Sequence, residues 1–464
     1  MGDRNDGRSP LLAADDSSSV PVNRTFEVYP YRWIVLAVYI LAAVANAVVL
    51  LTWAPITDKA QTYWNDIDLT AVNILSVAFQ VCYVPGTLFG LWCSERYALR
   101  GVLLIGGALT TVGCLVRLLG AVAINSAGTS ASYGLILFGT ILVGLAQPFY
   151  LNMPAKIAAT WFGVSERDIA TTMCSLGNPL GSAVGSILPA MFVTGDSDHA
   201  IKTGILGLLT TQAIISIVAI VITFFFFRSR PDTPASASAE QMQIIASTKA
   251  LNTMFDEMVK LVSTNTEYRK LLFSFTIVLG NLNAIAALLN QLPGGYSNGT
   301  VGLTGAVLIL TGFAGAFGTG FVLDYTKAYT QVLKCAYVLT FLSWLFFFAN
   351  CRGNNTALFV FSAAVLGGCT LPTIPSTIVS AVECSYPIAE DTSLGLLYMS
   401  ANVTAILLTL MGQLLLSLNT LGPAPLFPYA IFVGLLLLLA TVPVLTFKGS
   451  YFRLQQDTKM ENFA

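Results

Sequence analysis

The chain has 464 residues, of which 55% are hydrophobic and 10% charged, and its formal net charge is −1. Soluble domains carry about 25% charged residues, so this composition excludes an ordinary water-soluble fold and indicates that lipid is the solvent. A net charge near zero, without a basic stretch, also excludes nucleic acid as a partner.

Long apolar runs follow a polar start. Residues 1–30 lack a signal-peptide layout and predict a disordered cytosolic tail. Each later run of about 20 residues can cross a ~30 Å hydrocarbon core as a helix. Six lie near 31–53, 69–92, 101–124, 132–155, 169–194 and 204–227, and six near 271–293, 302–323, 332–350, 356–379, 393–417 and 425–446. The predicted fold is an all-α membrane protein with twelve transmembrane helices, in two pseudo-symmetric six-helix bundles at 31–227 and 271–446, with a cytosolic tail at 447–464.

Residues 228–270 separate the two bundles and hold most of the charge in mid-sequence, which predicts a cytosolic linker. Apolar residues recur within it at helical spacing, which is typical of an amphipathic helix on a membrane surface. These residues are Leu251, Met254, Phe255, Met258, Val259 and Val262. The alternative is a flexible linker without such a helix.

Lysine and arginine concentrate in loops that stay in the cytosol. With both termini inside, all 23 basic residues fall on the cytosolic side except Lys59, Arg117, Lys202 and Arg352. Arg117 lies within a span, close enough to the outer headgroups to snorkel, and the alternative is an anion-contacting residue of a pathway. The stretch Tyr451-Phe-Arg-Leu454 fits a tyrosine-type sorting signal. A multi-pass protein of the plasma membrane or of an endolysosomal membrane is therefore expected.

The two bundles share a weak internal repeat. Gly144, Pro148, Glu166 and Asn178 recur at one constant offset as Gly368, Pro372, Glu390 and Asn402. Helical rise places both asparagines about 14 Å into their spans, near the bilayer midplane. Amides at that depth are expensive unless they face protein or a wet cavity, and carriers place solute sites between their repeats. Contact with a solute is the prediction, and hydrogen bonding between helices is the alternative.

Charged motifs end two of the spans. Gly320-Phe-Val-Leu-Asp324-Tyr-Thr-Lys327 is the core of the major facilitator loop motif, and Gly90-Leu-Trp-Cys-Ser-Glu95-Arg96 resembles it, with Arg100 close behind. An acid beside basic residues at a helix end can close a gate between the two halves and release it when they rock. Glu166, Arg167 and Glu390 occupy equivalent loops. These eight residues are the predicted gate, although they could instead set only the topology.

A longer stretch carries a family resemblance. Ala146-Gln-Pro-Phe-Tyr-Leu-Asn-Met-Pro-Ala-Lys-Ile-Ala-Ala-Thr-Trp-Phe-Gly163, followed by Gly177-Asn-Pro-Leu-Gly181, resembles the feline leukaemia virus subgroup C receptor-related transporters. Thr52-Trp53-Ala-Pro55 is similar to their lysosomal relative disrupted in renal carcinoma. The resemblance implies a major facilitator fold and an alternating-access carrier of choline, ethanolamine, haem or a vitamin-like solute.

The sequence departs from that family where the solute would bind. Aligned on these motifs, Leu50 replaces an expected tryptophan, Asn283 a tyrosine, and Pro179 and Asn402 glutamines. A quaternary ammonium needs aromatic faces around it, which Trp53, Tyr150 and Tyr398 could supply. The predicted solute-binding residues are Asn46, Trp53, Gln147, Asn178, Asn283, Tyr398 and Asn402.

Acidic residues fall in tails, loops or span ends, and the single histidine, His199, lies in an outward loop. Proton-coupled carriers usually keep a titratable group in the pathway, so uncoupled, facilitated transport is expected. The alternatives are proton-coupled transport in the endolysosome and a receptor that does not transport. Because no His, Asp or Glu cluster lies at depth, neither enzymatic activity nor a metal or cofactor is expected. The expected partners are a small solute and the bilayer, and the expected state is a monomer.

Overall fold

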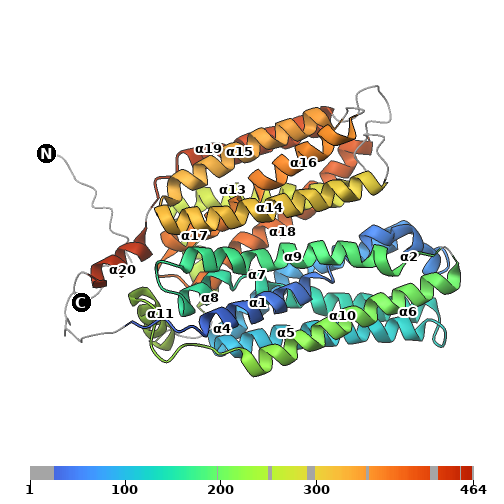
Figure 1. Cartoon of the computed structure of the whole chain (residues 1–464), viewed down its shortest axis with the longest axis horizontal. Helices are drawn as coiled ribbons and strands as arrows, with labels where there is room; N and C mark the ends of the chain where they lie inside the picture. The colour runs from blue at the N-terminus through green and yellow to red at the C-terminus, as the bar shows by residue number, and fades with distance from the viewer. Residues whose placement is uncertain are drawn as a thin grey trace.

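The computed structural model of the chain describes residues 26–195, 197–248, 253–289, 298–351, 355–417, 427–449 and 451–461. Figure 1 shows two helical bundles lying side by side with their helices running in the same general direction. The lower bundle contains the helices α1 to α10, and the upper bundle contains α13 to α19. We call them the first half and the second half.

The first half starts with α1 (Arg32–Ala47), and a short loop follows with η1 (Ala54–Ile56) and α2 (Thr57–Tyr63). The remaining helices are α3 (Leu69–Val81), α4 (Tyr83–Arg96), α5 (Leu99–Ala123), α6 (Thr129–Ala146), α7 (Pro148–Leu151), α8 (Pro154–Trp161), α9 (Arg167–Phe192) and α10 (Asp198–Phe226). The pairs α3/α4 and α6/α7 each form one interrupted span.

The second half repeats this order with α13 (Thr266–Leu288), α14 (Asn298–Thr326), α15 (Tyr329–Asn350), α16 (Thr356–Thr370), α17 (Thr373–Ser385), α18 (Glu390–Ser417) and α19 (Phe427–Leu445). Here α16 and α17 form one interrupted span. The internal repeat has a structural counterpart, because the interruptions fall at Pro148 and Pro372, which are one of its matched pairs. Proline lacks the N–H that would continue the helix.

Twelve membrane spans are confirmed as the architecture. Ten helices of the described residues are long and apolar enough to cross a membrane by themselves. The other two spans are α1, which has only 16 residues, and α9, which has 26. The first turns of α9 carry Arg167, Asp168, Thr171 and Thr172, all buried in protein, and this polar content lowers its apolarity.

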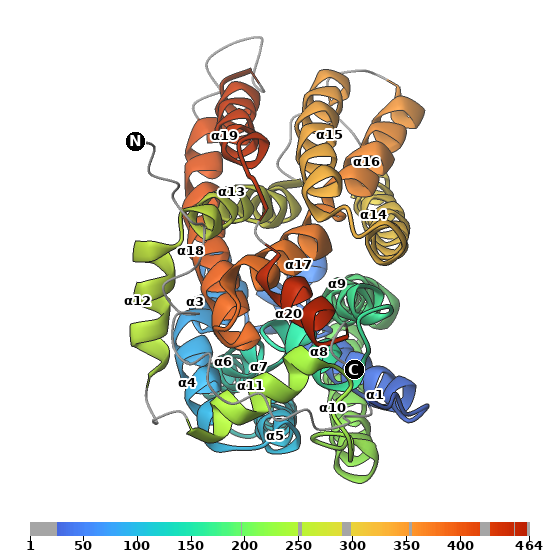
Figure 2. The same ribbon diagram turned by 90° about the vertical axis from the view of Figure 1, so that its left-hand side faces the viewer.

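Three further helices cover one end of the bundles, as the end-on view in Figure 2 shows. They are α11 (Ala237–Thr248) and α12 (Met254–Thr264) of the linker, and α20 (Phe452–Glu461) of the tail. The turns α4–α5, α8–α9, α14–α15 and α17–α18 lie at the same end. We call this end the linker face and the other end the opposite face.

The amphipathic linker helix predicted from the sequence corresponds to α12. Met254 and Met258 pack against Leu91, and Leu261 is also buried. Phe255 and Val259 point outward, with 52% and 67% of their surface exposed. Leu251 lies outside the described residues. One apolar side of the helix therefore rests on protein, and Phe255 and Val259 remain available to contact lipid.

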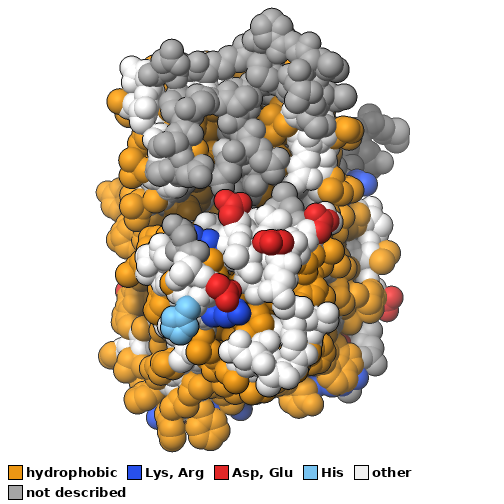
Figure 3. Space-filling view, turned by 90° about the vertical axis from the view of Figure 1, so that its right-hand side faces the viewer, with side chains coloured by type: hydrophobic (Ala, Val, Ile, Leu, Met, Phe, Trp, Pro, Cys, Tyr) orange, Lys and Arg blue, Asp and Glu red, His pale blue; other side chains and the backbone are white. Residues whose placement is uncertain are grey.

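The flanks of the molecule are apolar, as expected for a surface that faces lipid. Phe225, Leu119, Leu407 and Leu435 are each more than half exposed on the outer sides of four different spans. Figure 3, which looks onto the opposite face, shows hydrophobic side chains along its left, lower and right sides, with several acidic side chains near the centre. Water-soluble proteins rarely expose apolar patches this extensive.

Glycines allow α9 to approach α1 closely. A Cβ added at Gly181 would lie 2.7 Å from the Val44 carbonyl oxygen, and one at Gly185 would lie 2.4 Å from that of Val48. Small residues four apart permit this backbone contact between membrane helices. This close packing against α1 fixes α9, which contributes most to the contact with the second half.

Candidate functional site

The two halves meet at the linker face through charged side chains on both sides of the start of α9. The Asp324 carboxylate, from the last turn of α14, accepts hydrogen bonds from the backbone N–H groups of Asp168 (3.1 Å) and Ile169 (2.6 Å). Lys327 then bonds Asp168 (2.9 Å) and Asp324 (2.8 Å). An anion at a helix N-terminus is stabilised by the unpaired N–H groups and the helix dipole. The major facilitator loop motif thus joins the halves here.

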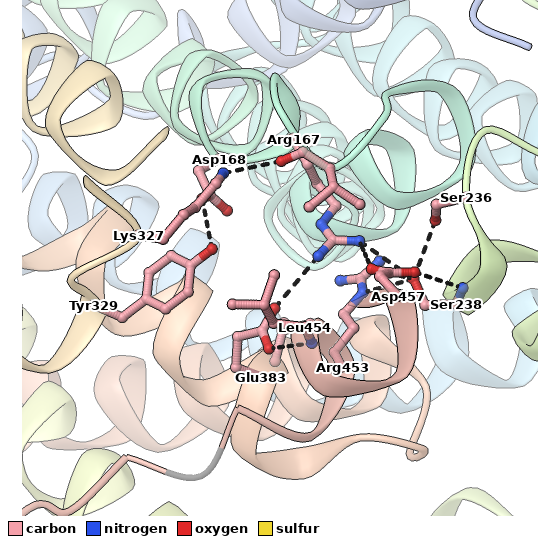
Figure 4. A network of polar contacts seen from close by, with 12 residues as sticks. Arg167, Asp168, Ser236, Ser238, Lys327, Tyr329, Glu383, Arg453, Leu454 and Asp457 are labelled. Atoms are coloured by element: carbon pink, nitrogen blue, oxygen red, sulfur yellow. Dashed lines mark hydrogen bonds and ion pairs between the residues drawn. The ribbon is translucent and has the colours of Figure 1, made fainter. Parts of the chain in front are cut away.

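A second contact between the halves is centred on Arg167, which is 3% exposed. Its guanidinium lies 2.9 Å from Asp457 of α20 and 3.5 Å from Glu383 of α17. Figure 4 shows Arg453 and Asp457 of the tail helix pointing into the same cluster. Burial and the nearby Arg167 guanidinium lower the pKa of Arg453. Because these charges are removed from water, they depend on one another for compensation.

The third contact is formed by Lys156 of α8, whose Nζ lies 2.8 Å from the carboxylate of Asp391 at the start of α18. Ser94 of α4 donates a hydrogen bond to Asp391 and accepts one from Lys156. Ser94 has the same place after Gly90 as Asp324 has after Gly320. Ser94, rather than the predicted Glu95, therefore has the sequence position of the motif acid, and it contacts Asp391 of the second half.

The other predicted gate residues have contacts of different kinds. Glu95 accepts a hydrogen bond from Thr253 of the linker (3.5 Å), and the Arg96 guanidinium stacks on Trp92. Arg100 bonds the Phe224 carbonyl, and Glu166 pairs with Arg32 at 2.9 Å, both within the first half. Glu390 lies 3.3 Å from Arg453 of the tail. From the predicted set, Arg167, Asp324 and Lys327 make the contacts that join the two halves.

Sequence reasoning missed several charged residues of these contacts between the halves, although a signal for them was present. Asp391 follows Arg167 at the same offset that relates the other repeat pairs, so the repeat places an acid and a base at equivalent helix starts. Asp391 pairs with Lys156 of α8 in the first half, and Arg167 pairs with Glu383 of α17 in the second half. Both partners lie near the end of the fourth span of their half. Within the described ranges, no group of three His, Cys, Asp or Glu side chains could hold a metal ion.

Tyrosines gather deeper between the halves. Tyr39, Tyr83, Tyr150 and Tyr398 are each at most 4% exposed, and the Tyr39 hydroxyl donates a hydrogen bond to the Tyr150 carbonyl. They come from α1, α4, α7 and α18, roughly 10–20 Å from the linker-face ends of these spans by helical rise. Tyr83 also donates a hydrogen bond to Asn152 (2.8 Å). The sequence had suggested only Tyr150 and Tyr398.

Three of the predicted solute-binding residues lie on α1, in the loop that follows it, and between α6 and α7. Asn46 donates hydrogen bonds to Thr110 (3.0 Å) and to the Val143 carbonyl (3.1 Å) and is fully buried, so its amide joins helices of the first half. Trp53 packs in an aromatic cluster with Trp64 towards the opposite face. Gln147 is buried at the interruption between α6 and α7.

The remaining four lie on α9, α13 and α18. Asn178 is half-buried, and its Nδ2 has no protein hydrogen-bond partner. A cavity of about 60 Å³, lined by α1, α9 and α14, adjoins it at Gly177. Asn402 donates to the Tyr398 carbonyl of its own helix (2.9 Å), and the Tyr398 ring packs edge-on against Phe275. Asn283 is half-buried. Asn178 thus keeps a side-chain donor without a protein partner among the described residues.

Arg117 does not snorkel, contrary to the sequence-based prediction. Its side chain is 1% exposed and bonds Gln212 and Thr52, each at 3.0 Å, beside the ring of Trp53. The described part of the chain offers it no carboxylate partner. Packing between α1, α5 and α10 encloses the guanidinium, so the long side chain turns into the bundle instead of reaching the headgroups.

Comparison with known proteins agrees with this geometry. The model of the Major Facilitator Superfamily matches residues 35–325. Solute carrier family 49 member A3 of Xenopus tropicalis is 30% identical over 90% of this chain and 84% of its own. The choline/ethanolamine transporter FLVCR1 of Mus terricolor is 30% identical over 92% of this chain and 78% of its own. The crystal structure of a double-tryptophan XylE mutant superposes with a TM-score of 0.70 at 11% identity, covering 93% of this chain and all of the other.

Proposed function

This chain belongs to the Major Facilitator Superfamily, and we propose that it carries a small amino alcohol of the choline or ethanolamine type by alternating access. That it is a membrane transporter of a small organic solute follows from its relatives, among which is a choline/ethanolamine transporter. The predicted family resemblance is confirmed by the same relatives. The identity of the solute, the absence of coupling to an ion and the monomeric state are parts of our proposal.

The tyrosine cluster between the halves is the observation that carries the choice of solute. Tyr39 and Tyr150 are buried in the core of the first half, and Tyr83 and Tyr398 are buried in a cluster that contains residues of both halves. The face of an aromatic ring attracts a cation, and aromatic cages recognise quaternary ammonium groups. The hydroxyls and the amide of Asn178 can bond the alcohol end of such a solute. These four rings take the place of the tryptophan and the tyrosine that the family resemblance leads one to expect where this chain has Leu50 and Asn283.

A second candidate, an anionic vitamin-like solute, is favoured by one observation. Arg117 carries a positive charge in the first half, without a carboxylate partner among the described residues. Such a charge would attract a carboxylate or phosphate. The tyrosine cluster is the better basis, because it contains residues of both halves and Arg117 contacts residues of the first half alone.

We further propose that the linker face is cytosolic. The basic residues of the linker, the tail and the short turns lie at this end, as the distribution of lysine and arginine requires. The conformation of the structure is then closed to the cytosol by the charged contacts. Tyr451 and Leu454 of the sorting pattern pack against the second half in this conformation. Both the plasma membrane and an endolysosomal membrane are compatible with this arrangement.

Uptake by purified protein in proteoliposomes tests the proposal. Labelled choline and ethanolamine should enter down their gradients without a proton gradient, and pyridoxine or haem should not. Replacing Asn178 and Asn402 together by alanine should abolish uptake, because it removes an amide from each half at mid-depth. Serine at the same two positions provides the matched control for loss of side-chain volume. Uptake of an anionic solute alone, or uptake only with a proton gradient, would contradict the proposal.

A further inference from the structure

The tail helix α20 buries charged side chains at the linker face. Arg453 and Asp457 lie four residues apart, and therefore on one side of the helix, and each is 2% exposed. Figure 4 shows both pointing into the cluster around Arg167. Charged residues are almost never buried to this degree unless they are paired. The tail is thus seated in the protein by specific ionic contacts.

Asp457 ties three parts of the chain together. One of its carboxylate oxygens lies 2.9 Å from Nη1 of Arg167 in the first half. The carboxylate also accepts hydrogen bonds from the backbone N–H (2.8 Å) and the hydroxyl (3.1 Å) of Ser238 in the linker helix α11. Because α20 follows α19 directly in the chain, this single carboxylate connects the first half and the linker to the second half.

The other contacts of α20 complete the charge balance on the second half. Arg453 faces Glu390 at 3.3 Å, and the backbone N–H of Leu454 donates to Glu383 at 2.9 Å. Arg167 is closer to Asp457 of the tail than to Glu383, from which it is 3.5 Å away. Removing α20 would therefore take the nearest partner from Arg167 and a donor from each of two buried carboxylates.

A helix as short as α20 depends on its contacts with the rest of the protein. Isolated helices shorter than about 12–15 residues are marginal in water, and α20 has 10 residues. Its start is held at α15, where the Tyr451 hydroxyl accepts the backbone N–H of Thr330 (3.1 Å) and the Tyr451 ring packs on Tyr329. Once released from these contacts, the segment would lose its helical order. Docked and released tails are thus two distinct states.

We propose that α20 is part of the gate together with the two halves, and that it must leave its binding site at the linker face before this face can open. Docking of α20 then sets the fraction of molecules closed at this face, and Arg453 and Asp457 act as positioning residues for Arg167, Glu383 and Glu390. The inference rests on the proposed function only in requiring the two faces to open in turn. Anything that binds the released tail would favour the conformation open at the linker face.

Hydrogen exchange followed by mass spectrometry on the full-length protein in lipid nanodiscs tests this inference without any solute. Asp457→Asn removes the charge but keeps an oxygen that can accept from Ser238. We expect the amides at the start of α9, including Asp168 and Ile169, to exchange at least about tenfold faster in this variant, since buried ion pairs contribute strongly once desolvated. Deleting residues 450–464 should have at least the same effect.

Two matched variants complete the test. Asp457→Glu keeps the charge and should restore most of the slow exchange, and Gln455→Ala, on the exposed side of α20, should match the wild type. Unchanged exchange at α9 in both Asp457→Asn and the deletion would overturn the inference, even if both variants melted at lower temperature. Failure of choline uptake would refute the proposed function and leave this result unaffected.

Discussion

Arg167→Met is the substitution that should disturb the gate most. The guanidinium and its two carboxylate partners, Glu383 and Asp457, are each about 3% exposed, so solvent screens them little. Removing one member of a buried ionic group costs about 3–5 kcal/mol, because the charges left behind stay uncompensated. In the conformation open at the linker face, water would solvate the same carboxylates. The free-energy cost therefore falls on the closed conformation. It is large enough that a closed conformation favoured by about 100 to one would become the less populated state.

Pulsed electron paramagnetic resonance can measure this shift. Spin labels at Tyr97 and Tyr325 report across the linker face from the first and second halves, and both sites are exposed, at 49% and 92%. In a background without the native cysteines, Arg167→Met should move the distance distribution to longer values. Arg269→Met, at an exposed arginine that bonds Thr266 at the start of α13, is the control. An unchanged distribution in a folded Arg167→Met protein would refute the role assigned to these contacts.

Three further predictions concern other contacts. Lys156→Met should also shift the distance distribution to longer values, but by less, because Lys156 is 27% exposed and Asp391 keeps its hydrogen bond from Ser94. The closed conformation should lose about 1–3 kcal/mol. A larger shift than that of Arg167→Met would contradict this order. Gly185→Ala should lower the melting temperature by forcing α9 away from α1, at about 1–3 kcal/mol, whereas Gly302→Ala, with no atom within 4 Å of the new Cβ, should not. Arg117→Met should leave the melting temperature unchanged or raise it, since no carboxylate among the described residues depends on that charge; a large fall would show that its two hydrogen bonds outweigh the burial of the charge.

The sequence was sufficient for the fold because the dominant signal was local. A run of about 20 apolar residues must span a bilayer as a helix, whichever neighbours it meets. The internal repeat also placed Pro148 and Pro372 at equivalent positions, and both interrupt their spans. The span that contains α9 is not among the ten most apolar ones, and it was still recognisable from its place in the count of six.

The site was harder to predict because it depends on which side of each helix faces the other half. Asn46 and Asn178 look alike in sequence, yet Asn46 bonds Thr110 within the first half and Asn178 keeps a donor without a protein partner. Depth along a helix follows from residue number, but rotation about its axis follows from packing. The same limit explains why Ser94, one residue before Glu95, contacts Asp391.

The charge pattern of the gate suggests why the tail joins it on one side. The repeat gives two equivalent contacts, Lys156 with Asp391 and Arg167 with Glu383, but their environments differ. Lys156 is partly exposed, so water solvates its ammonium and the short contact suffices. Arg167 is almost fully buried, and its distance to Glu383 is 3.5 Å, so one carboxylate at this range compensates it poorly. Asp457 supplies the missing anion at 2.9 Å. The asymmetry between two otherwise equivalent contacts therefore makes closure of the linker face depend on a segment outside both bundles.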